Sequence, residues 1–110
     1  MILHIRPAAD WPAAEVRPDG PGFVHCADPG TVHMPANRLF AGRTDLLLLE
    51  IDTARLGVPV RWEPGDPPIP DGPWFPHVYG PIPAAAVVAV HAFPPRADGT
   101  FTLPDSVAHR

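Results

Sequence analysis

The sequence predicts an α+β domain in which a mixed β-sheet is accompanied by two short helices. Short apolar segments outnumber the helical ones, and the helical segments do not alternate regularly with them, which disfavours a doubly wound α/β fold. The 110 residues are 45% hydrophobic, as expected of one globular core. The clearest apolar segments contain none of the 18 prolines, so we expect a folded domain with a stiff, proline-rich loop.

The beginning of the chain predicts two strands separated by a helix and a turn. Residues 2–5 are apolar apart from one histidine, which suits a short strand. Residues 8–16 are expected to form a short helix, with Pro12 near its first turn, where proline is tolerated. The prolines and glycines of residues 18–22 predict a turn, and residues 23–26 predict the second strand.

A longer helix and the most apolar strand follow. Residues 31–40 are expected to form the helix, although Pro35 should kink it or mark its beginning. Gly42 is suited to end this helix. The leucine run in residues 46–52 is apolar on both faces, as expected of a central strand.

The second half of the sequence predicts further strands and one long loop. Residues 53–56 suit a single helical turn, and residues 58–63 suit a strand with alternating apolar and charged positions. Residues 64–83 combine many prolines with several aromatic side chains, which is unusual for an inert linker. We therefore expect a loop packed over the sheet that ends in a short strand at residues 77–79. Residues 85–93 predict the last strand.

The charge composition excludes several classes of function. The net charge of −4 disfavours non-specific nucleic acid binding, which requires a basic surface. All basic residues other than histidine are arginines, so any anion must be held by arginine or by backbone N–H groups. The single cysteine, Cys26, excludes an internal disulfide. With no signal-peptide pattern and no apolar run long enough to cross a bilayer, we expect a cytoplasmic protein that binds no membrane.

Two histidines on predicted strands, His4 and His25, are the strongest candidates for a functional site. A lone strand histidine is more often a core or edge residue, but two on neighbouring strands can direct both rings into one cleft. Imidazole can donate or accept at a sugar hydroxyl, and imidazolium can bind a phosphate. Cys26 follows His25 directly, but adjacent strand residues point to opposite faces. We therefore expect a buried apolar cysteine rather than a Cys–His nucleophile.

Other polar residues are weaker candidates. Glu50 ends the leucine-rich strand on the side of its first and third leucines, either in the cleft or at the rim of the sheet. Asn37 and Arg38 fall on the second helix, where Arg38 could contact a phosphate. Several scattered side chains could ligate a metal: His4, His25, His33, His77 and Glu50. None of them falls in a short ligand motif, so no metal is expected.

Several blocks of the sequence resemble a known family when they are taken in order. The blocks are Ile2-Leu3-His4-Ile5, Trp11, Gly22-Phe23-Val24-His25-Cys26, Ala36-Asn37-Arg38-Leu39-Phe40, residues 46–52, Val60-Arg61-Trp62-Glu63 and Phe75-Pro76-His77-Val78-Tyr79-Gly80-Pro81. Together they resemble the bacterial domain-of-unknown-function 952 family over residues 1–93. Residues 94–110 lie outside the match, so we expect one domain at residues 1–93 and a loosely attached C-terminal tail at residues 94–110.

The resemblance implies a fold similar to that of the ADP-ribosyltransferases, with a split, mostly antiparallel β core and a nucleotide cleft between its halves. It further suggests a relation to the branch that contains the NAD-dependent RNA 2′-phosphotransferases. That branch has one histidine on each of the first two strands, and His4 and His25 match these positions. Many transferases also use a catalytic glutamate, for which Glu50 and Glu63 are candidates by chemistry. His77 and Tyr79 would line the cleft.

Three functional hypotheses follow. The first is a nucleotide-binding or NAD-binding enzyme of ADP-ribosyltransferase or phosphotransferase type, with NAD as a substrate. In it His4 and His25 contact ribose or phosphate, and an arginine such as Arg38 holds the pyrophosphate. The second is a non-catalytic module that has kept the cleft and lost the chemistry, since no catalytic glutamate is obvious. The third, ranked last, is a metal-dependent hydrolase that uses His4, His25 and His77. Nothing in the sequence points to a protein partner.

Overall fold

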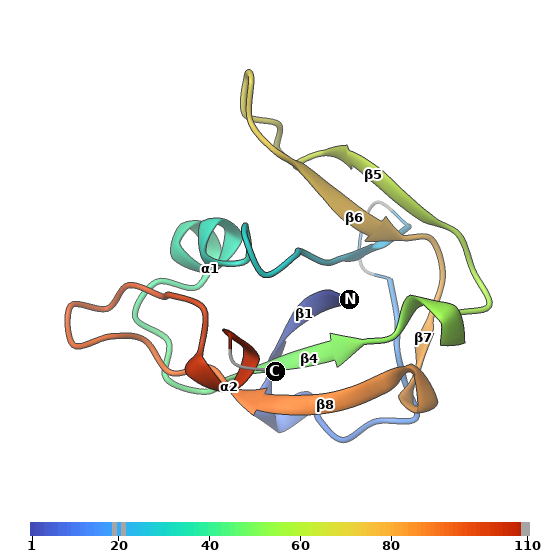
Figure 1. Ribbon diagram of the computed structural model, residues 1–110, viewed down its shortest axis with the longest axis horizontal. Coiled ribbons are helices and arrows are strands. Elements are labelled where there is room, and N and C mark those ends of the chain that lie inside the picture. The colour runs from blue at the N-terminus through green and yellow to red at the C-terminus, as the bar shows by residue number, and fades with distance from the viewer. Residues whose placement is uncertain (19, 21, 109–110) are drawn as a thin grey trace.

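Two three-stranded antiparallel sheets form most of the fold in the computed structural model, which describes residues 1–18, 20 and 22–108 (Figure 1). The first sheet has the strand order β1-β4-β8. Its strands are β1 (Ile2–Pro7), β4 (Leu46–Ile51) and β8 (Val87–Ala92). Among the described residues the paired strands of both sheets run antiparallel, which confirms the predicted α+β class with a mostly antiparallel core.

The second sheet has the strand order β3-β6-β5. Its strands are β3 (Val24–His25), β6 (Trp74–Val78) and β5 (Val60–Pro64). A small separate pair joins β2 (Glu15–Val16) to β7 (Ile82–Pro83). The turn that the sequence predicts at residues 18–22 includes Asp19 and Pro21, which lie outside the described residues.

Strand β4 is the centre of the first sheet and is apolar on both faces because both faces are covered. Leu46 and Leu48 belong to a buried cluster that also contains Phe101. Leu49 and Ile51 belong to a second buried cluster, which includes side chains of the other sheet. Successive residues of a strand point to opposite faces, so one leucine run supplies both clusters. The predicted central strand is confirmed.

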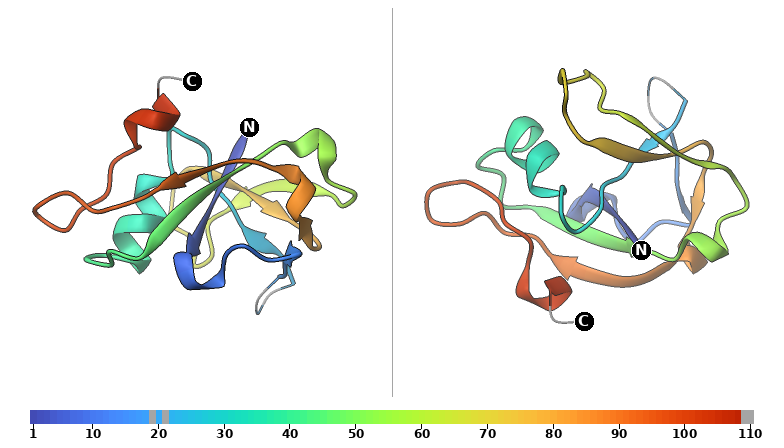
Figure 2. Two further views of the ribbon diagram at one scale, coloured as in Figure 1. Left: turned by 90° about the horizontal axis from the view of Figure 1, so that it is seen from below. Right: turned by 45° about the horizontal axis from the view of Figure 1, so that its top comes forward.

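Among the described residues, a short backbone bridge between Leu3 and Ala27 links the two sheets. The Leu3 amide donates to the Ala27 carbonyl over 2.7 Å, and the Ala27 amide donates back to the Leu3 carbonyl over 2.8 Å. On one side of this bridge β1 pairs with β4, and on the other side β3 pairs with β6. The segments therefore separate beyond the bridge, and two views show β5 and β6 standing apart from β4 and β8 (Figures 1 and 2).

Helix α1 (His33–Leu39) is shorter at both ends than the sequence predicts. Pro35 lies in its first turn, where backbone amides have no intrahelical acceptor, so the missing N–H of proline costs the helix no hydrogen bond. The chain then turns at Gly42, whose φ of 79° suits a residue without a side chain. None of the helices in the described part of the chain is long and apolar enough to span a bilayer.

The predicted helix at residues 8–16 is wrong beyond its first turn. Only Ala8–Asp10 form a 3-10 turn, η1, and the end of the predicted helix is instead the strand β2. Trp11 is extended, with φ −135° and ψ 140°. It precedes Pro12, and a proline ring disfavours the helical conformation of the residue before it.

The proline-rich segment at residues 64–83 forms more strand than predicted. Strand β6 begins at Trp74 rather than at residue 77 and passes through Pro76. The Pro76 carbonyl still accepts from the Cys26 amide over 3.2 Å, so the proline interrupts the ladder without ending it.

Two further 3-10 turns precede β5 and β8: η2 (Thr53–Arg55) and η3 (Ala84–Ala86).

The C-terminal segment differs from the loosely attached tail that the sequence predicts for residues 94–110. Phe101 is 1% exposed, and its ring centroid lies 4.8 Å from that of Phe93. The Asn37 side-chain amide donates to the Phe101 carbonyl over 3.2 Å and accepts from the Phe101 amide over 2.6 Å. Helix α2 (Asp105–Ala108) adds Val107 to the same buried cluster. The segment is therefore part of the core as far as residue 108.

We expect the substitution Phe101→Ala to lower the free energy of unfolding by about 3–5 kcal/mol, because removing a buried aromatic ring leaves a cavity. Urea denaturation of the variant and the wild type measures this difference. Thr102→Ala, at an exposed position of the same segment, is the matched control and should change stability by less than about 0.5 kcal/mol. Equal stabilities for Phe101→Ala and Thr102→Ala would show that the segment is loosely attached after all.

Candidate functional site

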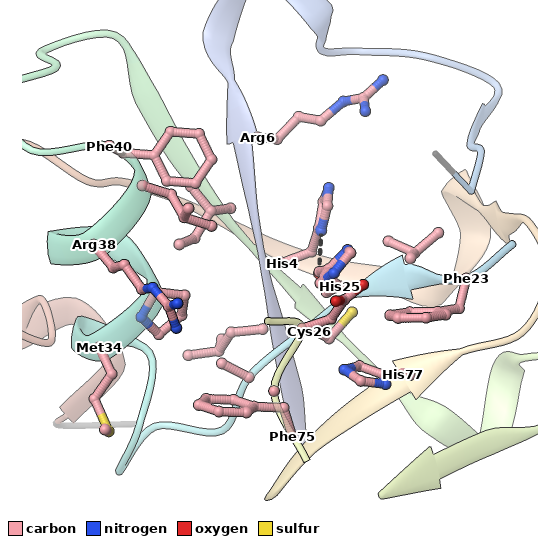
Figure 3. A pocket seen from close by; sticks show the side chains of 18 of the residues that line it. His4, Arg6, Phe23, His25, Cys26, Met34, Arg38, Phe40, Phe75 and His77 are labelled. Carbon is pink, nitrogen blue, oxygen red and sulfur yellow. Dashed lines mark hydrogen bonds between the residues drawn. The ribbon is translucent and has the colours of Figure 1, made fainter. Parts of the chain in front are cut away.

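A cavity of about 660 Å³ lies where β1 and β3 separate (Figure 3). Its walls come from β1, from the segment around β3, from α1 and from the β5–β6 loop, with Phe75 and His77 of β6. Figure 3 labels the side chains most relevant to its chemistry: His4, Arg6, Phe23, His25, Arg38 and His77. The two histidines that the sequence predicts on separate strands therefore line one cavity.

His4 is bonded to the backbone of the strand from which β1 separates. Its Nδ1 donates to the His25 carbonyl over 2.8 Å (Figure 3). A carbonyl can only accept, so the proton of the neutral His4 ring is on Nδ1, and Nε2 is the acceptor nitrogen of that tautomer. The contact also gives the carbonyl a partner at the point where the two strands no longer pair.

His25 and Cys26 point to opposite sides of their segment, as the sequence predicts. The His25 ring is exposed and lies 4.7 Å from the ring of Phe23, which is on the same face. Cys26 belongs to the buried cluster that contains Val24. Burial raises the pKa of the Cys26 thiol well above its ordinary value, because the thiolate would lose its hydration. Cys26 is therefore a packing residue and not a nucleophile.

His77 lines the cavity from β6, and its ring contacts a carboxylate and two aromatic rings. Its Nδ1 lies 2.9 Å from Oε1 of Glu63 on β5, and the Tyr79 hydroxyl donates to the same oxygen over 2.5 Å. The Phe23 ring stacks on the His77 ring with centroids 3.9 Å apart. The His25 ring meets His77 edge-on with centroids 5.6 Å apart. Glu63 and Tyr79 lie behind the cavity wall rather than in it.

The carboxylate of Glu63 is stabilised by this network. Hydrogen bonds from Tyr79 and from His77 lower the pKa of Glu63, because both favour the charged form of the carboxyl group. The bond to Glu63 raises the pKa of Tyr79, because ionising the phenol would remove the shared proton and add a second negative charge. The Arg61 guanidinium lies over the Tyr79 ring at 5.0 Å from its centroid. The network therefore keeps Glu63 ionised and Tyr79 neutral.

Three arginines line the cavity, of which the sequence singled out only Arg38. Arg38 donates to the Pro67 carbonyl of the β5–β6 loop over a long 3.3 Å. Arg17 is largely exposed and pairs with Glu15 at 3.0 Å. Arg6 was missed, although it lies two residues after His4 in a strand, and side chains at such a spacing share a face. That spacing could have identified it.

Two predicted site residues lie elsewhere. Asn37 bonds the C-terminal segment, since adjacent helical positions point about 100° apart and only Arg38 reaches the cavity. Glu50 is 0% exposed and packs on the Leu46 side of β4, where its Oε1 lies 3.8 Å from Nε2 of His91. The sequence correctly predicted that Glu50 shares a face of β4 with Leu46. That face is buried core, however, and does not line the cavity beside His4.

The metal-dependent alternative finds no support in the geometry. Within residues 1–18, 20 and 22–108, no three histidine, cysteine or acidic side chains are arranged to hold a metal ion. His4, His25 and His77 line the same cavity. They are not arranged as such a group, so the geometry gives no reason to prefer the metal-dependent hydrolase.

The chain belongs to a family described as "Protein of unknown function (DUF952)", whose model matches residues 5–90. The crystal structure of protein CC0527 from Caulobacter crescentus is similar, with 28% sequence identity and a TM-score of 0.81 over 97% of each chain. The solution NMR structure of CC0527 is 26% identical, with a TM-score of 0.78 over 99% of this chain and 97% of that one. No curated protein matches the sequence. The family resemblance that the sequence blocks indicated is thereby confirmed.

We expect Glu63→Gln to destabilise the protein at neutral pH and the difference from wild type to shrink in acid. Folding lowers the pKa of Glu63, so its carboxylate contributes stability above the ordinary value of 4.5 and loses it as pH falls through the lower folded value. Thermal melts over a range of acidic to neutral pH measure the effect. Tyr79→Phe removes the strongest bond to Glu63 and should show the same trend. A difference that stays constant with pH would contradict this account.

Proposed function

We propose that the cavity binds a nucleotide, with NAD or ADP-ribose as the ligand class. The observation that carries this proposal is the convergence of two strand histidines and three arginines on one cavity. Its volume of about 660 Å³ falls within the roughly 300–1,000 Å³ that is typical of small-molecule sites. Arginine suits phosphate oxygens, and imidazole suits phosphate and sugar hydroxyl groups.

The arginines supply the argument for a phosphate. Nε of Arg6 is buried and has no hydrogen-bond partner among the described residues. A buried donor of a charged group costs free energy unless an acceptor satisfies it, and a phosphate oxygen is such an acceptor. Arg38 holds only the Pro67 carbonyl, at a distance near the limit for a hydrogen bond, and can exchange this partner for a pyrophosphate.

The histidines and the aromatic residues supply the argument for a nucleoside. The tautomer of neutral His4 makes Nε2 an acceptor, which is what a ribose hydroxyl requires. His25 is exposed beside it and provides a second ring for the same sugar. Phe40 and Phe75 form half-buried apolar surface on the cavity wall, against which a flat base can pack.

The ADP-ribosyltransferase-like fold that the family resemblance implies is our reason to propose NAD over other nucleotides, because that fold would place two strand histidines beside a split β core. Transfer chemistry passes through an oxocarbenium-like state that a carboxylate usually stabilises. Among the described residues, the carboxylates that line the cavity are Asp10 and Asp66, and neither Glu50 nor Glu63 lines it. We therefore propose nucleotide binding first, with ADP-ribosyl transfer as the second candidate on the strength of His4 and His25.

The proposal predicts that ADP-ribose and NAD bind to the wild-type protein in calorimetric or NMR titrations. Arg6→Ala and Arg38→Ala should weaken binding about 10-fold to 100-fold, since a hydrogen bond to a charged group is worth about 1.5–3 kcal/mol. His4→Ala and His25→Ala should each weaken it up to about 10-fold, as expected for a hydroxyl contact. Adenosine, which lacks phosphate, should bind more weakly and respond to the histidine substitutions only.

Matched controls are available outside the cavity. His33 and Arg96 are exposed and do not line it, so His33→Ala and Arg96→Ala should bind as the wild type does. No binding of ADP-ribose, NAD or adenosine at millimolar ligand would overturn the proposed function. Incubation with NAD separates the two candidates, because release of nicotinamide that His4→Ala abolishes favours the transferase, whereas binding without release favours the binding module.

A further inference from the structure

The imidazole of His77 is hydrogen-bonded through Nδ1 to the Glu63 carboxylate, which also accepts from the Tyr79 hydroxyl. We propose that His77 is the proton-accepting group of the cavity, that Glu63 is the positioning residue that fixes its tautomer, and that Tyr79 holds the carboxylate of Glu63 in place. The inference rests on the proposed nucleotide site, because the hydroxyl group that His77 would contact belongs to the ribose of the bound nucleotide. It assigns a role to His77 that differs from the ribose and phosphate contacts proposed for the other two histidines.

The tautomer of His77 follows from its partner. Nδ1 lies 2.9 Å from Oε1 of Glu63, and a carboxylate accepts hydrogen bonds only, so the ring proton of neutral His77 is on Nδ1. Nε2 then carries the lone pair of the ring. Among the described residues, Nε2 has no hydrogen-bond partner. Glu63 lies outside the cavity and His77 lines it, so we infer that the ring edge bearing Nε2, which faces away from Glu63, is the one that a ligand meets.

The ring is also immobilised, which a positioned base requires. His77 is 3% exposed, and the ring of Phe23 stacks on it at 3.9 Å between centroids, nearly parallel at 21°. The antiparallel register pairs Glu63 with Phe75 and Arg61 with His77. Glu63 and His77 are therefore diagonal neighbours on one face of the β5–β6 pair, close enough for side chains of their length to meet. Rotation of the imidazole would break the bond to Glu63 and the stack on Phe23 together.

The carboxylate of Glu63 also supplies the negative charge that stabilises His77 once it has accepted a proton. In the proposed step, the proton of a ligand hydroxyl passes to Nε2 of His77, and the electron pair of the O–H bond stays on the ligand oxygen. The resulting imidazolium lies beside the carboxylate of Glu63, which offsets its charge. Tyr79 donates to the same oxygen and so fixes the direction from which Glu63 meets His77. An imidazole oriented by a carboxylate is the usual arrangement of a histidine base.

The tautomer can be measured directly by the ¹⁵N chemical shifts of the imidazole nitrogens. In wild type we expect His77 as the Nδ1–H form. Glu63→Gln should keep this form, because the amide oxygen still accepts from Nδ1, whereas Glu63→Ala should shift His77 toward the Nε2–H form. Tyr79→Phe should leave the tautomer unchanged and tests whether the fold tolerates a change in this network. His33, exposed and in α1, is the internal control and should not respond to any variant.

The second measurement uses ADP-ribose as the probe. Its addition should shift the Nε2 signal of wild-type His77, because Nε2 accepts from a ribose hydroxyl, and Glu63→Ala should reduce that shift while Glu63→Gln retains it. A merely structural role for His77 would leave Nε2 unmoved by ligand.

The outcomes separate this inference from the proposed function. An Nε2–H form of His77 in the wild type, or an Nε2 signal that stays constant while ADP-ribose binds, would overturn the role of His77 and leave nucleotide binding standing. Failure of ADP-ribose, NAD and adenosine to bind would overturn the proposed function and with it the ribose contact. A tautomer that does not change in folded Glu63→Ala would overturn the positioning role of Glu63 whatever the ligand does.

Discussion

The structure depends on the two-way backbone hydrogen bond between Leu3 and Ala27. It is the bridge that joins the two three-stranded sheets, and each strand leaves it to pair with a different partner. Buried backbone groups must be paired, so the strands can separate only where another group takes over. The His4 side chain does this for the His25 carbonyl. The cavity therefore lies where strand pairing stops. His4 lies at this point and supplies the donor that the His25 carbonyl needs.

The chemistry of the cavity is divided among elements that are far apart in the sequence. Strand β1 contributes His4 and Arg6, helix α1 contributes Arg38, and β6 contributes His77 with its support from Glu63 on β5. His4 and His77 are each held by a short hydrogen bond, whereas the arginine of α1 meets the β5–β6 loop through a single long one. Such a division would suit the proposed nucleotide site, with fixed contacts to the sugar and an adjustable contact to the phosphate.

The sequence predicted the parts of the site that local periodicity controls. Alternation along a strand placed His25 and Cys26 on opposite faces, and the structure confirms it. The same alternation correctly grouped Glu50 with the leucines of its strand but could not show that this face is buried core. The fold was predicted best at β4, whose apolar run is long and uninterrupted. It was predicted worst at residues 8–16, where one proline sets the conformation of the residue before it.

By itself the sequence determined the α+β class, the central leucine strand, the family and two of the histidines that line the cavity. These depend on residue type and short-range spacing, which a linear chain displays directly. Only the tertiary structure decided that Asn37 serves the C-terminal segment, that Glu63 supports His77, and that Phe101 belongs to the core. Each of these contacts joins side chains from separate elements. Which residues meet is set by how the two sheets diverge and what packs against them, and no local pattern encodes that geometry.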